Sequence, residues 1–135
     1  MLHVNELAKQ CHVSTDAIRY YTHLGLLHPI RNPDNRYRLY NSIDSKRLNF
    51  ILRAKHLGFS LHDIVRIFED CDKGNSPCPH VRKIIQYRIE ENRKRIKLEI
   101  ELQKRMEHAM VKWDTMPDKD PGSDKICTLI ESFTE

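Results

Sequence analysis

Apolar side chains recur three and four residues apart in four stretches of the first seventy residues. This spacing places them on one face of a helix and predicts four short amphipathic helices. The positions are Val4, Leu7, Ala8 and Cys11; Ala17, Ile18, Tyr21 and Leu24; Ile43, Phe50, Ile51 and Ala54, with Arg47 on the same side; and Leu61, Ile64, Val65 and Phe68. Since Cys11 falls on such a face, we interpret it as a small core residue.

Polar and small residues mark where these helices begin and end. Ser14, Ser42 and Ser60 stand at N-cap positions, and Gly25 and Gly58 stand where a helix should stop. A tight break at residues 12–13 separates the first two helices. Two short helices across such a turn form the sequence pattern of a helix-turn-helix.

Between the second and third helices, the turn residues Pro33, Asp34 and Asn35 precede a segment that alternates with period two. This pattern predicts a small hairpin with Asp34-Asn35 at its tip, leaning on the helices because isolated hairpins are marginal. We expect its basic and aromatic side chains to project and contact phosphates; the alternative is a solvated turn with incidental charge. These side chains are Arg31, Arg36, Arg38, Tyr37 and Tyr40.

A much longer helix is predicted over residues 79–113, because no glycine or proline occurs from Val81 to Trp113 and Pro79 stands at a first helical position. At about 1.5 Å per residue this helix is roughly 50 Å long, too long for a small globule to cover. Its seam at 4,3 spacing is typical of a dimerisation helix, and we hypothesise that the polar seam residues set register. The seam is Ile85, Ile89, Asn92, Ile96, Glu99, Gln103, Met106, Met110 and Trp113.

The last segment begins with a loop that contains Pro117, Pro121 and Gly122. Ser123 then stands where it can cap a short terminal helix. The apolar positions Ile126, Leu129, Ile130 and Phe133 follow at helical spacing, so we expect this helix to lie on the long helix.

Charge is unevenly distributed along the chain. Residues 1–60 hold nine Lys/Arg against four Asp/Glu, whereas residues 61–135 hold fourteen against fifteen. The positive part includes Arg19 and Tyr20 on the polar face of the second helix. This asymmetry indicates a nucleic-acid partner at that end, with a basic solvated face as the alternative.

Composition narrows the functional classes further. The sequence shows no signal peptide and no apolar run of membrane-spanning length, so we expect a cytoplasmic protein without membrane contact. Its four cysteines are irregularly spaced and predict core, metal or redox roles rather than a disulfide framework. An enzyme is the least favoured class, because the sequence shows no nucleophile–base pair or phosphate loop.

Six motifs occur in an order and spacing that resemble the MerR family of bacterial transcription regulators, over roughly residues 2–112. They are Val4-Asn5-Glu6-Leu7-Ala8, Ile18-Arg19-Tyr20-Tyr21, Gly25-Leu26-Leu27, Tyr37-Arg38-Leu39-Tyr40, Leu48-x-Phe50-Ile51 and Leu57-Gly58-Phe59-Ser60-Leu61. The resemblance implies an antiparallel dimer on a pseudo-palindromic operator within a promoter whose spacer is too long. Effector binding would bend and untwist that DNA, so that RNA polymerase engages both promoter elements.

The expected fold is therefore mainly α, with four parts. They are a winged helix-turn-helix DNA-binding domain (1–70), a linker (71–78), an antiparallel coiled-coil dimerisation helix (79–113), and an effector-binding loop with a short C-terminal helix (114–135). Helix Ser14–His23 would enter the major groove. The expected DNA contacts are Ser14, Thr15, Asp16, Arg19, Tyr20, Arg31, Arg36, Tyr37, Arg38 and Tyr40. Asp16 departs from this chemistry, because a carboxylate repels phosphate and can favour only a cytosine amino group.

For the effector, the resemblance implies a metal site shared across the dimer. In the family's metal sensors a Cys before the long helix joins cysteines beyond its end; Cys78 and Cys127 match two of these positions. Lys112-Trp113-Asp114 stands where a further Cys would be, so His80, or an oxygen of Asp114, Asp118 or Asp120, would complete the set. We expect a soft or borderline divalent ion of the zinc, cadmium, lead or mercury class, with Cys71 and His108 as surface residues.

Two other interpretations stay open. In one, the same regulator senses an electrophile, an oxidant or an organic molecule through Cys78 or Cys127. In the other, the chain is a dimeric coiled-coil interaction protein whose basic end is incidental, and it would show no salt-dependent affinity for DNA.

Overall fold

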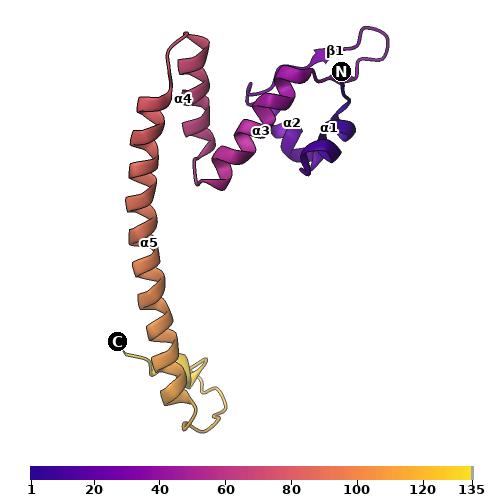
Figure 1. Ribbon diagram of the computed structural model, residues 1–135. Helices are drawn as coiled ribbons and strands as arrows, with labels where there is room; N and C mark the ends of the chain where they lie inside the picture. Colours follow the sequence, from indigo (N-terminus) through magenta and orange to yellow (C-terminus); the bar gives the residue numbers. More distant parts are fainter. Residues whose placement is uncertain (135) are drawn as a thin grey trace. The chain divides into compact units, whose positions relative to one another are not determined.

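A computed structural model describes residues 1–134 and is mainly helical, as the pattern predicts (Figure 1). The elements are α1 (Val4–Cys11), α2 (Thr15–His23), β1 (Ile30–Arg31), β2 (Arg38–Leu39), α3 (Ser42–His56), α4 (Leu61–Asp72), α5 (Cys78–Trp113) and α6 (Thr128–Glu131). They form two compact units, Met1–Arg88 and a second that begins at Ile89. Within the described residues, no helix has both the length and the apolar character needed to span a membrane.

The helix-turn-helix forms at the expected positions. Ser14 caps α2, because its Oγ accepts a hydrogen bond from the Ala17 N–H at 3.1 Å. His12 ends α1 in the left-handed region, with φ 56°, and Gly25 follows α2 with φ 79°. These two positive-φ residues turn the chain sharply on either side of α2.

The predicted hairpin is also present. β1 and β2 pair antiparallel, with Ile30 opposite Leu39 and Arg31 opposite Arg38. Leu2 continues the ladder on the other side, since its N–H and carbonyl exchange hydrogen bonds with Tyr40 at 2.8 and 2.7 Å. The N-terminal segment therefore ties this wing to the helices.

The core of the N-terminal unit draws on α1 to α4 and on the segments between them. Its fully buried large side chains are Leu7, Ile18, Leu27, Tyr40, Leu48, Ile51, Ile64 and Ile67. Three predicted inward positions are wrong, because Ile43 is 64% exposed and Leu24 and Phe50 also lie outside the core. α3 instead buries the face that carries Asp44, Leu48 and Ile51, and its N-cap is Asn41 rather than Ser42.

In the second unit, the C-terminal segment lies beside the last turns of α5 (Figure 1). Ile130 and Phe133 line an apolar groove of about 280 Å³ with residues of α5, including Met106 and Trp113. The prediction that Ser123 caps the terminal helix is wrong, because Cys127 occupies the N-cap of α6. Ile126 is 89% exposed, so packing on α5 supports only the last turn of the predicted helix.

Candidate nucleic-acid interface

Side chains from the N-terminal segment, α2 and the wing line a groove with a volume of about 600 Å³, which we call the arginine groove. Four arginines reach it, one from α2 and three from the wing. Its lining includes His3, Asn5, Arg19, Arg31, Arg36, Tyr37 and Arg38. A concave surface with several guanidinium groups suits an extended polyanion, because each group can donate two hydrogen bonds to a phosphate.

On α2, Arg19 is held by its neighbours one turn earlier. Its Nη1 donates to Asp16 Oδ1 at 3.3 Å and to Thr15 Oγ1 at 3.4 Å. Both charged side chains are exposed, so this pair orients Arg19 more than it stabilises the fold. Asp16 therefore forms an ion pair with Arg19 of its own helix. The i, i+3 spacing of the two residues already indicated this pair in the sequence. Tyr20 is exposed on the same helix.

The wing tip is shaped by asparagine side chains. Asn32 Oδ1 accepts from the Asp34 N–H at 2.9 Å, and Asn35 Oδ1 accepts from the Tyr37 N–H at 3.0 Å. Arg36, which follows Asn35, lies in the left-handed region with φ 63°. Tyr37 is exposed, and His3 stands edge-on to its ring at 6.3 Å. His3 was not among the predicted contacts, because the chain pairing that brings it to the wing is long-range.

Tyr40 corrects one of the predicted contacts. Its side chain does not project from the wing but is fully buried, and its hydroxyl lies 2.9 Å from Thr22 Oγ1. The bridge to Leu2 holds the backbone of Tyr40, and its ring lies among the core residues of the N-terminal unit. Tyr40 therefore fastens the wing to α2 as part of the core.

The predicted metal ligands lie in different parts of the chain. Cys78 is exposed at the first residue of α5, and Cys127 is half-buried at the N-cap of α6. His80 is half-buried, with its Nδ1 3.1 Å from Asp70 Oδ2, which leaves Nε2 for another partner. In residues 1–134 no three His, Cys, Asp or Glu side chains of one chain are grouped to hold a metal ion.

The other thiols and His108 lie where they were expected. Cys11 packs against the core, and burial raises the pKa of its thiol, which disfavours the reactive thiolate. Cys71 and His108 are exposed.

Two family models match the chain. The model described as "MerR HTH family regulatory protein" matches residues 2–71, and that described as "MerR, DNA binding" matches residues 45–109. The mercuric resistance operon regulatory protein of Bacillus cereus is 30% identical over 132 residues, covering 96% of this chain and 95% of the relative.

Solved structures share the fold. The transcription regulator PbrR691 from Ralstonia metallidurans CH34, in complex with lead(II), is similar with a TM-score of 0.74 at 22% identity, over 98% of each chain. EcmrR in the EcmrR–DNA complex of EcmrR-RPo is similar with a TM-score of 0.67 at 28% identity. That match covers 82% of this chain and 39% of EcmrR.

Proposed function

Because the chain belongs to the MerR family of helix-turn-helix regulatory proteins, we propose that it acts as a homodimer that reshapes promoter DNA when a divalent metal ion binds. As a member of this family it is a DNA-binding transcription regulator and not an enzyme. The dimer, the DNA contacts, the partnership with RNA polymerase and the metal ion are the proposed parts.

The arginine groove is the observation that carries the proposal. It joins the exposed face of α2, through Arg19, to the wing, through Arg31, Arg36 and Arg38. In a winged helix-turn-helix the second helix reads base edges in the major groove while the wing contacts the adjacent backbone. We assign base contacts to Thr15, Asp16 and Arg19, and backbone contacts to Tyr20, Tyr37 and the wing arginines. Ser14 acts here through the cap that starts α2.

The dimer is supported by the exposed seam of α5. Ile89, Ile96, Met106 and Met110 are each about half exposed on this helix, although the seam spacing is that of a buried interface. An antiparallel partner helix would cover them. It would also place Cys78 and His80 of one protomer near Cys127 of the other.

The ligand chemistry fits a soft or borderline ion. Thiolates and imidazole suit zinc, cadmium, lead and mercury better than hard ions, and PbrR691 was solved with lead(II). Asp70 already holds the Nδ1 side of His80, as outer-shell carboxylates do for metal-bound histidines. No three such donors of one chain are grouped within residues 1–134, and we place the site between two protomers. A bound ion would tie the start of one α5 to the loop beyond the end of the other.

Salt dependence of DNA binding tests the groove. Arg38→Ala should weaken binding to a duplex selected by the wild type from random-sequence DNA. It should also lower the slope of log K against log salt by about one, because one phosphate contact is lost. Fluorescence anisotropy titrations at several salt concentrations measure both quantities. Lys97→Ala, which removes an exposed cation of α5, is the matched control. An unchanged slope in Arg38→Ala would contradict the assignment.

A further inference from the structure

The first three turns of α5 belong to the N-terminal unit and pack along one stripe on its core. Val81, Ile84 and Ile85 are partly buried against its core. Arg88 occupies the next stripe position, seven residues after Val81, and is also the last residue of this unit. A charged side chain thus stands where the helical period would place an apolar one.

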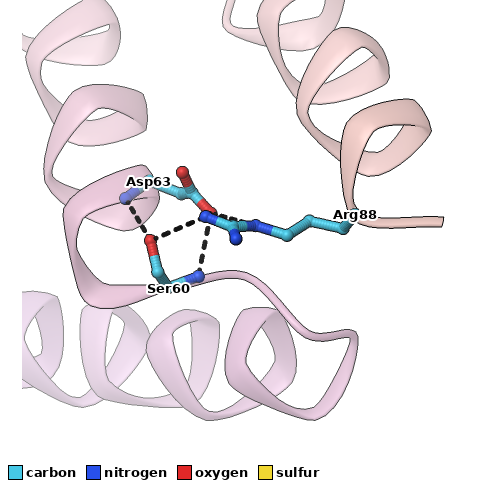
Figure 2. Close-up of polar contacts among 3 residues, drawn as sticks. All are labelled: Ser60, Asp63 and Arg88. Atoms are coloured by element: carbon cyan, nitrogen blue, oxygen red, sulfur yellow. Dashed lines mark hydrogen bonds and ion pairs between the residues drawn. The ribbon is translucent and has the colours of Figure 1, made fainter. Parts of the chain in front are cut away.

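The guanidinium of Arg88 reaches the first turn of α4 (Figure 2). Its Nε and Nη2 donate to Asp63 Oδ2 at 3.0 and 2.8 Å, and Nη2 also donates to Ser60 Oγ at 3.2 Å. The Ser60 N–H donates to the same Asp63 oxygen at 2.9 Å, and the Asp63 N–H donates to Ser60 Oγ at 3.1 Å. One carboxylate oxygen therefore closes the capping box of α4 and binds the arginine of α5.

This pair is shielded from water. The side chain of Asp63 is 12% exposed and that of Arg88 is 33% exposed. Burial by itself raises the pKa of Asp63, but the hydrogen bonds from the Ser60 N–H, Arg88 and the Ser60 hydroxyl, together with the Arg88 charge, outweigh it. They hold the pKa below its usual range. The contact is thus charge-assisted and stronger than a neutral hydrogen bond.

A second polar contact joins the same two helices near the intervening loop. His80 Nδ1, in the first turn of α5, lies 3.1 Å from Asp70 Oδ2 near the end of α4. The two polar contacts lie on either side of the apolar contacts of Val81, Ile84 and Ile85, and so hold both ends of this segment of α5 to α4. The Arg88 contact is the one farther along α5, so it restrains the angle between the helices more strongly.

We propose that Ser60, Asp63 and Arg88, here called the latch, are positioning residues that make α4 and the first three turns of α5 move as one body. Because Ile64, Ile67 and Phe68 anchor α4 in the core, a displacement of α5 then displaces the core with it. The latch would transmit a movement of the dimerisation helix α5 to the N-terminal unit, which carries the arginine groove. This second part rests on the proposed function, in which the effector acts on α5.

Amide hydrogen exchange of the whole protein tests the latch itself. Arg88→Met keeps an unbranched apolar stem, and Asp63→Asn keeps an oxygen that can accept from the Ser60 N–H. Each variant should exchange at least about tenfold faster than the wild type in residues 78–88, with residues 4–23 unchanged. Arg93→Met is the control, because its ion pair with Glu90 is exposed on the same helix. Wild-type exchange in residues 78–88 would overturn the latch, as would acceleration confined to residues 60–64.

A measurement of DNA shape tests whether the latch transmits metal binding to the DNA, which we call the relay. Each protein is bound to an end-labelled duplex that carries the selected site, and Zn(II), Cd(II), Pb(II) and Hg(II) are titrated separately. Metal-free affinity should stay within about threefold of wild type, while the metal-driven change in energy transfer between the duplex ends should fall at least about fivefold. A full metal-driven change in both variants would overturn the relay. A wild type without any such change would contradict the proposed function, and exchange in residues 78–88 would then decide the latch alone.

Discussion

At the scale of single residues, Arg36 occupies a backbone conformation that disfavours its own side chain. Its φ of 63° lies in the left-handed region, which costs an L-residue other than Asn or Gly roughly 1–2 kcal/mol. Backbone contacts hold it there, since its N–H donates to the Asn32 carbonyl at 2.7 Å and its carbonyl accepts from Arg31 Nη1 at 3.3 Å. The arginine adds positive charge to the groove where asparagine would suit the turn better.

This conflict predicts opposite effects of one substitution. Arg36→Asn should stabilise the protein by about 0.5–1 kcal/mol, because asparagine tolerates the left-handed region, and should weaken DNA binding through the lost charge. Urea unfolding and anisotropy titration measure the two effects. Arg38→Asn is the matched control, because it removes a charge from β2 without relieving a strained φ. Equal stability changes in both variants would argue against the strain.

Predictions for single residues were correct where they depend only on residues close by in the sequence. The cap at Ser14 and the core position of Cys11 depend on residues within two helical turns, and both are confirmed. The outward position of Tyr40 was wrong because its ring packs in the core and its hydroxyl lies beside Thr22 of α2, eighteen residues earlier. Alternation along one short strand cannot show which other segment covers its end.

At the scale of elements, the seam of α5 leads to a prediction about oligomeric state. Ile96→Glu should weaken self-association at least roughly 100-fold, because a twofold interface loses two buried isoleucines and gains two carboxylates. Sedimentation equilibrium of the wild type and the variant measures the change.

The control for this prediction lies on the same helix. Leu98 is 64% exposed but falls outside the seam, so Leu98→Glu should leave self-association unchanged. Dissociation by Leu98→Glu with none by Ile96→Glu would place the interface on another face of α5.

Element boundaries were predictable where a cap and a periodic face coincide. α4 begins after Ser60 as expected, because Ser60 and Asp63 form a capping box. α6 begins later than expected: Ser123 is a suitable cap, but Ile126 finds no apolar surface to cover it. Arg88 continues the stripe of Val81, yet the sequence could not show that Asp63, twenty-five residues earlier, receives it.

At the scale of the whole molecule, the fold class and the family followed from motifs in the first half of the chain. The metal site followed only from the resemblance and stays a prediction, because its proposed ligands come from separated segments of two protomers. Within residues 1–134 of a single chain, no three His, Cys, Asp or Glu side chains are grouped to hold an ion. Only the assembled dimer would complete the site, and the number of ions it binds depends on that assembly.

Metal binding by a mixed dimer tests this account most directly. Cys78→Ser and Cys127→Ser should each abolish tight binding, because each removes a ligand from both sites of the dimer. A dimer purified with one chain of each variant keeps Cys78 on one protomer and Cys127 on the other, so one site stays intact. Equilibrium dialysis should therefore find about half as much metal as in the wild type. A mixed dimer that binds no more metal than either single variant would contradict a site shared across antiparallel helices.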